Sequence, residues 1–374
     1  MALPPSISVN GPEGQETMIF SEATPEQLLP CYKLGAVNFA PQLPEKDFIE
    51  CCEYIGQLPL AQGKGSRFWC LARESNPGHV VAMCKTLHRD LLTRDAAGTR
   101  EGQGYCIGMV ATDARYRRLG LAAFLMNKVA EWMDGPGEGI ASMLYSSVGE
   151  FYVDKGWKIL PASQSTLSVG PGTIINRLDL PRTRSLTAED IPQLCARDIG
   201  EMKADFVRHK LAADEVLMAV VPTPKIVTWL HDWMGFFNMK VTGKVQPSKG
   251  AICEDAGVWV YWDHRMIRQE LAIQRVRIVA NARGSSTLKI EEALAGLLLD
   301  ALAEAQEWKL PKVVVWNPIP ELQRAIHLLK DRFGVEVLDE ERTSSNIPSV
   351  RWRGGNKEKT ARVQVYANEY YAWS

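Results

Sequence analysis

The sequence lacks the patterns that indicate a metal protein, a membrane span or a nucleic-acid-binding protein. None of its eight cysteines has CxxC spacing, and its six histidines form no HxH or HxxxH pair. No apolar run reaches the ~18 residues of a membrane-spanning helix. Neither sign of charge is in excess, because 43 Lys and Arg are balanced by 44 Asp and Glu. We therefore expect no bound metal, no nucleic-acid partner and no membrane partner.

A secretion signal is missing as well. The N-terminus MALPPSISVN has no basic segment followed by an apolar one. The eight cysteines are therefore expected to be buried free thiols in a reducing compartment rather than disulfides. We expect a cytoplasmic protein, and the sequence leaves its oligomeric state open.

Length and composition predict two globular domains. At roughly 150 residues per domain, 374 residues suggest two. Hydrophobic residues make up 46% and charged residues 23%, close to the globular average. The Pro- and Gly-containing residues 1–16 are expected to form a flexible leader. A later stretch punctuated by Pro and Gly places the two domains at 17–175 and 176–374.

Hydrophobic periodicity predicts alternating strands and helices in both halves. From residue 17 the expected order is β-α-α-β-β-β-α-β-α-β, including a strand over 105–112 and a helix beginning near residue 121. The order strand-strand-helix-strand-helix occurs once in each half, without a repeat at residue level. The predicted fold class is therefore α/β with mixed (α+β) sheets.

The segment from Val110 to Ala122 carries the strongest chemical signal. It predicts a strand, a short basic turn, and a helix with a glycine in its first turn. Free N–H groups at such a helix N-terminus, together with the helix dipole, bind anions. Gly120 would let a phosphate approach the backbone, and Arg117 and Arg118 add positive charge. On this segment alone, an amphipathic helix with a solvated basic start explains the residues equally well.

Two blocks resemble the GNAT superfamily of acyl-CoA-dependent N-acyltransferases. The hexapeptide RRLGLA at 117–122 fits the R/Q-x-x-G-x-G/A pyrophosphate loop of that superfamily. Further along, LYSSVGEFYVDKGW at 144–157 resembles its next block, a strand and a short helix ending in Tyr-x-x-x-Gly-aromatic. The pattern is neither a Walker loop nor GxGxxG. The resemblance implies an N-terminal GNAT fold that uses acetyl-CoA.

The same resemblance implies roles for individual residues. The strand ending at Thr112 would splay from the strand over 144–146, and the slot between them would take the pantetheine arm. Backbone groups of 110–112 would pair with that arm, and the N–H groups of 118–122 would hold the pyrophosphate. The residues assigned to acetyl-CoA in this way are Val110, Ala111, Thr112, Arg117, Arg118, Leu119, Gly120, Leu121, Ala122, Tyr145 and Ser146.

The resemblance implies one catalytic residue and leaves the base open. Tyr152 matches the tyrosine that protonates the leaving thiolate, although ordinary packing against Trp157 also explains it. An acceptor amine with a pKa near 10.4 must lose a proton before attack. The strand over 105–112 carries no carboxylate for that purpose, and an ordered water would serve equally well. The nearest carboxylates in the sequence are Glu101, Asp113 and Glu150.

The layout of the whole chain is similar to fungal lysine ε-N-acetyltransferases of the lysine-catabolic type. The similarity rests on 144–146 and on two C-terminal blocks, 297–300 and 313–318. It implies acetyl-CoA as donor and free lysine, or a related small amine, as acceptor. The residues themselves do not show lysine recognition.

The second half is expected to be a degenerate GNAT-like α/β domain without its own cofactor site. Between its central strand and its long helix, residues 282–287 lack the R-x-x-G-x-G spacing. Aromatic residues of this half are expected mostly in the core. Some of them, among Trp229, Trp233, Phe236, Phe237, Trp259, Tyr261 and Trp262, could also wall an acceptor pocket. The aromatic tail at 370–374 suggests a docked end, with its carboxylate near the first domain.

The leading prediction is an N-acetyltransferase that works by direct attack of the amine in a ternary complex, without a covalent intermediate. One alternative is a protein or histone lysine acetyltransferase, which would need an acidic groove for a basic peptide. The other is a non-catalytic CoA-binding module, which the unassigned base leaves open.

Overall fold

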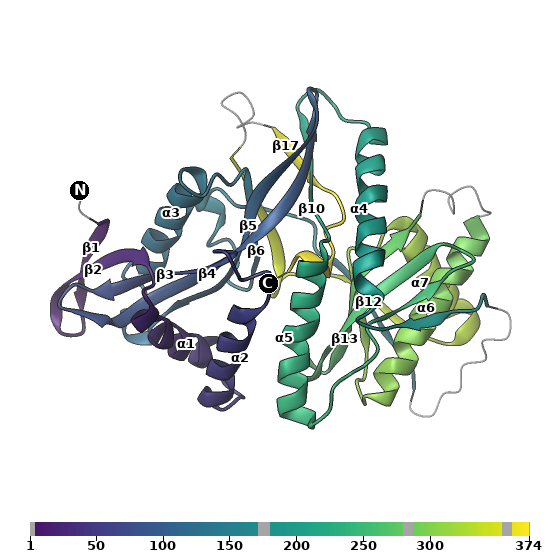
Figure 1. The fold of residues 1–374 in the computed structure, drawn as a ribbon, viewed down its shortest axis with the longest axis horizontal. Coiled ribbons are helices and arrows are strands. Elements are labelled where there is room, and N and C mark those ends of the chain that lie inside the picture. Colours follow the sequence, from purple (N-terminus) through teal and green to yellow (C-terminus); the bar gives the residue numbers. More distant parts are fainter. Residues whose placement is uncertain (1–3, 171–179, 280–286, 354–360, 374) are drawn as a thin grey trace.

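The computed structural model describes residues 4–170, 180–279, 287–353 and 361–373. Two sheets lie side by side, each covered by helices (Figure 1). Both sheets contain parallel and antiparallel pairs, which confirms the expected α/β class with mixed sheets.

The first sheet has the strand order β1-β2-β3-β4-β5-β6-β16-β7. Its strands are β1 (Ser6–Gly11), β2 (Gly14–Glu22), β3 (Ser66–Arg73), β4 (Asn76–Asp95), β5 (Gly98–Thr112), β6 (Ala141–Ser146), β7 (Lys158–Ile159) and β16 (Ile347–Trp352). Helices α1 (Pro25–Phe39) and α2 (Glu45–Gln57) pack on one face, and α3 (Leu121–Asp134) packs on the other. The order expected from residue 17 is observed in this sheet.

A hairpin of β1 and β2 occupies residues 6–16 of the flexible leader expected over 1–16, whose residues 1–3 lie outside the described chain. The pairing runs from Ser6 opposite Ile19 to Gly11 opposite Gly14. Ile7 and Val9 alternate along β1 and pack against the core around α3. This short alternation gives an edge strand enough apolar contact to stay paired.

The second sheet has the order β15-β8-β14-β13-β12-β11-β9. Its strands are β8 (Ser163–Ser168), β9 (Arg184–Leu186), β11 (Gly250–Cys253), β12 (Val258–Arg265), β13 (Glu270–Ile278), β14 (Val313–Trp316) and β15 (Glu336–Glu341). Its helices are α4 (Ile191–Arg208), α5 (Pro224–Thr242), α6 (Thr287–Glu307) and α7 (Pro320–Phe333). The segment 282–287, which lacks the R-x-x-G-x-G spacing, lies outside the described residues except for Thr287, where α6 begins.

The two halves of the chain exchange strands. Strands β10 (Glu215–Val220), β16 and β17 (Arg362–Val365) belong to the second half but pair in the first sheet. Strand β8 precedes residue 175 but belongs to the second sheet. The expected boundary between 175 and 176 lies within 171–179, outside the described residues, and stays a prediction.

All eight cysteines are buried free thiols, as expected. In the described parts of the chain, no helix is long and apolar enough to cross a membrane.

Candidate functional site

Strands β5 and β6 part at the place where a slot was expected. Their parallel pairing runs from Gly104 opposite Ala141 to Ile107 opposite Leu144 and ends there, although both strands continue. The register between β4 and β5 shifts just beyond this point, and Met109 has a φ of 54°. Such a bulge bends a strand away from its neighbour. The last residues of β5, including Val110, Ala111 and Thr112, therefore leave the line of β6.

The turn after β5 presents the start of α3. Gly120 is the N-cap residue of α3 with a φ of 80°, and nothing lies within 4 Å of a Cβ built there. The first N–H groups of a helix have no partners within it. Leu121 is buried in the core, whereas Gly120 and Arg118 are exposed. This first turn therefore offers open N–H groups and the positive end of the helix dipole to an anion.

The basic side chains of this turn are held differently from one another. Arg117 reaches back to α1, where its Nη2 donates to Asn38 Oδ1 at 2.9 Å. Arg115 pairs with Asp113 at 2.8 Å, and this hydrogen bond lowers the pKa of the Asp113 carboxyl. Arg118 has no hydrogen bond or ion pair to another described residue and is free to meet an anion.

The tyrosines and the serine of the second block occupy distinct environments. Tyr152 is buried in the core around α3, edge-on to Trp157 with ring centroids 6.2 Å apart. Burial raises the pKa of Tyr152, which keeps its phenol protonated at neutral pH. Ser146 Oγ accepts a hydrogen bond from Val148 N at 3.0 Å and so holds the turn after β6. The buried hydroxyl of Tyr145 has no hydrogen-bond partner among the described residues.

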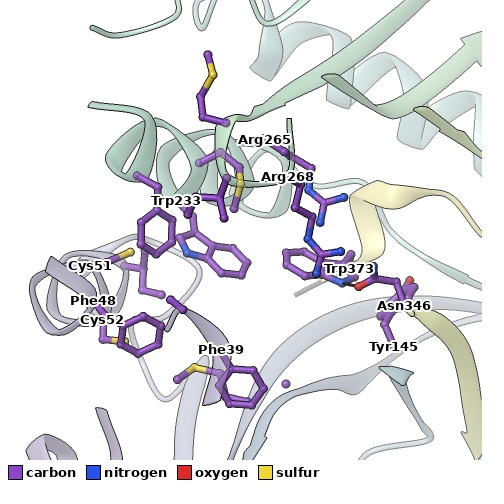
Figure 2. Close-up of a pocket in the computed structure, with 18 of the residues that line it drawn as sticks. Phe39, Phe48, Cys51, Cys52, Tyr145, Trp233, Arg265, Arg268, Asn346 and Trp373 are labelled. Atoms are coloured by element: carbon purple, nitrogen blue, oxygen red, sulfur yellow. Dashed lines mark hydrogen bonds between the residues drawn. The ribbon is translucent and has the colours of Figure 1, made fainter. Parts of the chain in front are cut away.

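A pocket of about 510 Å³ lies beside the bulge of β5, between elements of both halves (Figure 2). Residues 107–109 of β5 and Tyr145 of β6 form one wall. Helices α1, α2 and α5, the short helix η3 (Met266–Arg268) and the C-terminal tail form the others. The apolar lining includes Phe39, Phe48, Ile55, Trp233, Phe237 and Trp373.

Two family models match the chain. The model described as LYC1 GNAT-like C-terminal domain matches residues 168–374, and the model of the acetyltransferase (GNAT) family matches residues 29–151. The chain belongs to the GNAT superfamily, in the family with a LYC1 GNAT-like C-terminal domain. It is an acyltransferase, and the GNAT fold implies acetyl-CoA as its cosubstrate.

Solved structures with the same fold span most of this GNAT chain. A GCN5-related N-acetyltransferase from Kribbella flavida has a TM-score of 0.52 and 14% identity, covering 90% of this chain and 71% of that one. One from Anabaena variabilis has a TM-score of 0.51 and 12% identity, covering 90% and 72%. At these identities the likeness shows the fold alone. The comparison with curated proteins found no match.

The C-terminal tail of this GNAT protein is docked, as the sequence suggested. Tyr370 and Tyr371 are fully buried in the short helix η5 (Tyr370–Ala372). Trp373 stacks on Trp233 of α5 and borders the pocket. The buried Arg89 of β4 donates from Nη2 to the Trp373 carbonyl oxygen at 3.2 Å. The tail therefore completes a pocket whose other walls come from both sheets.

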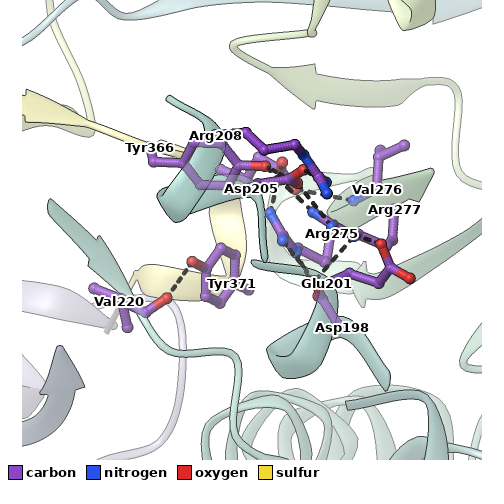
Figure 3. A network of polar contacts seen from close by, with 11 residues as sticks. Asp198, Glu201, Asp205, Arg208, Val220, Arg275, Val276, Arg277, Tyr366 and Tyr371 are labelled. Atoms are coloured by element: carbon purple, nitrogen blue, oxygen red, sulfur yellow. Dashed lines mark hydrogen bonds and ion pairs between the residues drawn. The ribbon is translucent and has the colours of Figure 1, made fainter. Parts of the chain in front are cut away.

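A buried ionic network holds this tail in place (Figure 3). Arg275 of β13 makes two hydrogen bonds to Asp198 of α4, at 2.8 and 2.9 Å. Its third contact, from Nη1 to Glu369 Oε1 at 2.9 Å, reaches the tail. Burial raises the pKa of Glu369, and the neighbouring Arg275 opposes that shift. Tyr371 adds a hydrogen bond from its hydroxyl to the Val220 carbonyl oxygen at 2.5 Å.

None of the carboxylates weighed as a base borders the pocket. Glu101 is exposed and pairs with Lys203, and Asp113 pairs with Arg115. Glu150 is exposed in the turn after β6. Trp233 and Phe237, two of the aromatic residues that the sequence suggested as pocket walls, do line it, whereas sequence reasoning missed Arg265 and Arg268. No local motif marks these residues, because the pocket forms only when distant segments meet.

Proposed function

We propose that this GNAT protein transfers an acetyl group from acetyl-CoA to a primary amine, with free lysine or a related small amine as the acceptor. The observation that carries the proposal is that β5 connects the pocket to the N-terminus of α3. The strand borders the pocket at residues 107–109 and leads through Thr112 to the open first turn of α3. The open first turn of α3 suits a pyrophosphate, and the pocket at residues 107–109 suits an acceptor.

The residues at the first end fit acetyl-CoA. The pyrophosphate would be held by the N–H groups of Arg118, Leu119, Gly120, Leu121 and Ala122. Arg117 would fix the position of this loop through its hydrogen bond to Asn38 of α1. The backbone of residues 110–112 would pair with the pantetheine arm, and Tyr145 and Ser146 would face it from β6. The absence of atoms near a Cβ at Gly120 supports close approach of a phosphate. Acetyl-CoA, when bound, supplies the activated acetyl group.

Tyr152 would act as the acid that protonates the leaving sulfur. A phenol is protonated at neutral pH and can therefore donate to the leaving thiolate. The amine would reach the bulge of β5 from the pocket and attack directly, since a positioned neutral amine needs no covalent intermediate. The base stays unassigned, and a water in the pocket would take the proton.

We further propose that 17–175 and 176–374 are the GNAT and GNAT-like units, with the β1–β2 hairpin added to the first unit and strands exchanged between the two sheets, and that the protein works in the cytoplasm. The second domain would contribute α5, η3 and the tail to the acceptor pocket. Ligand sites favour such positions between domains.

Calorimetry with CoA tests the cofactor assignment. The double variant Arg117→Ala/Gly120→Asp removes the link to α1 and places a negative, strained residue in the anion site. We expect it to abolish CoA binding while the thermal unfolding transition remains cooperative. CoA affinity equal to that of the wild type would contradict the assignment.

A panel of acceptors separates this proposal from the alternatives. Release of free thiol from acetyl-CoA with free lysine or other small amines supports the proposed function. Thiol release with basic peptides alone would favour a protein acetyltransferase. Tight CoA binding without thiol release for any acceptor would favour the binding module.

A further inference from the structure

The lining of the pocket carries positive charge and no negative charge, and the proposed function assigns no role to that positive charge. Its lining contains two arginines, Arg265 and Arg268, and none of the described lining residues is a carboxylate. Figure 2 shows both arginines at one end, away from Phe39 and Phe48. The described lining therefore offers a partner to a negative charge on an acceptor and no carboxylate to a positive charge.

Arg265 already has partners, and these contacts build the wall of the pocket. Its Nη1 donates to Glu270 Oε1 at 2.6 Å, and the side chain is only 5% exposed. Its guanidinium lies over the rings of Tyr370 and Trp373, 5.1 and 5.6 Å from their centroids. Arg265 therefore holds the tail against η3.

Arg268 differs because it has no such partner. It ends η3 at the exposed rim of the pocket and makes no hydrogen bond or ion pair with another described residue. The nearby Glu270 is engaged by Arg265 and by Lys312 at 3.3 Å. Burial and the charge of Arg265 lower the pKa of Arg268, and Glu270 and Tyr370 oppose that shift only in part. An anion beside Arg268 would relieve that repulsion.

We propose that Arg268 binds a carboxylate on the acceptor while the amine of the same molecule reaches the bulge of β5. This inference rests on the proposed function and narrows its substrate class to primary amines joined to a carboxylate by an apolar chain. A guanidinium pairs with a carboxylate through two parallel hydrogen bonds. Trp233 and Phe237, which line the pocket, would pack on the connecting chain. Diamines and basic peptides would lack the anchored charge.

Steady-state kinetics with three matched acceptors tests this anchor. Free lysine carries the carboxylate, lysinamide replaces it with a neutral amide, and 1,5-diaminopentane lacks it. For the wild type, we expect kcat/KM for lysine to exceed that for either analogue by about 10–100-fold, the range of a charged hydrogen-bonded pair. The difference should lie mainly in KM.

Variants assign that preference to one side chain. Arg268→Ala should reduce the ratio of kcat/KM for lysine over diaminopentane by about 10-fold or more, and Arg268→Lys should restore part of it. The control Arg182→Ala removes an exposed arginine that makes no hydrogen bond or ion pair with another described residue, and it should leave the ratio unchanged. Thermal unfolding and CoA calorimetry report on folding and on the cofactor site of each variant.

The outcomes separate this inference from the function on which it rests. Equal kcat/KM for all three acceptors in the wild type, or an unchanged ratio in Arg268→Ala, overturns the anchor and leaves the acetyltransferase intact. Calorimetry of lysine binding in the presence of CoA gives a readout without turnover. If no acceptor releases thiol and lysine does not bind, both the proposed function and the anchor are overturned.

Discussion

Trp373 stacks on Trp233 with ring centroids 5.0 Å apart and ring planes at 8° to one another. This contact joins the C-terminal tail to α5 at the edge of the pocket (Figure 2). The tail arrives there because Glu369 is bound by Arg275 and the Val276 N–H deep in the second sheet. The pocket that we propose for the acceptor therefore depends on the tail around Glu369 and Trp373.

Replacing Trp373 tests that dependence. Trp373→Ala should lower kcat/KM for the acceptor by about 3–10-fold, because an aromatic pair contributes ~0.5–1.5 kcal/mol beyond the area it buries. CoA affinity should not change, since the anion site lies at α3. Trp373→Phe keeps an aromatic ring and should stay near wild type. Equal activity of the alanine and wild-type proteins would show that the tail is not part of the site.

The two tyrosines should give different kinetic signatures. Tyr152→Phe removes the proposed acid, and kcat for thiol release should fall by about 100-fold or more, the usual range for general acid catalysis. Tyr145→Phe removes a buried hydroxyl that lines the pocket without a partner in the described chain. Because Tyr145 borders the pocket and is also proposed to face the pantetheine arm, this variant should change KM for the acceptor or for acetyl-CoA while kcat stays near that of the wild type. Full kcat in Tyr152→Phe would remove that residue from the mechanism.

The buried network around Arg275 should contribute more to the free energy of unfolding than exposed ion pairs do. Asp198→Asn leaves a fully buried arginine short of its carboxylate and should lower the free energy of unfolding by about 3–5 kcal/mol. The matched control is Asp214→Asn, whose pair with Arg362 is 63% and 66% exposed and should matter by less than about 1 kcal/mol. Denaturant unfolding measures both. Similar losses in the two variants would contradict the assigned role of burial.

Lys85 should make the free energy of unfolding depend on pH in the alkaline range. It is buried on β4 beneath Trp229, with Nζ 4.8 Å from the ring centroid, and burial lowers its pKa to about 8. The unfolded chain keeps its proton up to a pKa near 10.4. Below pH 8 the folded state holds a buried charge, and between pH 8 and 10.4 it has released a proton that the unfolded state retains. The unfavourable contribution of Lys85 is therefore largest below pH 8 and disappears as the pH rises.

Lys85→Met measures this contribution. The variant should be more stable than wild type at pH 7, by up to on the order of 3 kcal/mol. The advantage should shrink as the pH rises from 8 to 10. Thermal or denaturant unfolding across this range checks the slope. A difference that does not change with pH would mean that Lys85 is already neutral or better solvated in the folded protein.

The parts of the site that could be predicted are those encoded by neighbouring residues. RRLGLA places a glycine at the start of an apolar helix, and the structure has that glycine at the N-cap of α3 with a positive φ. The alternating and helical patterns likewise gave the order from β2 to β7. Pairing between distant segments leaves no local pattern. The insertion of β16 beside β6, and the meeting of Arg268, Trp233 and Trp373, therefore could not be predicted.

The most direct test mixes purified protein with acetyl-CoA and free lysine and follows thiol release together with the mass of the product. We predict free thiol and monoacetylated lysine in equal amounts, with neither formed by the Arg117→Ala/Gly120→Asp variant. CoA binding by the wild type without thiol or acetylated product, for lysine and for every other small amine tested, would contradict the proposed function.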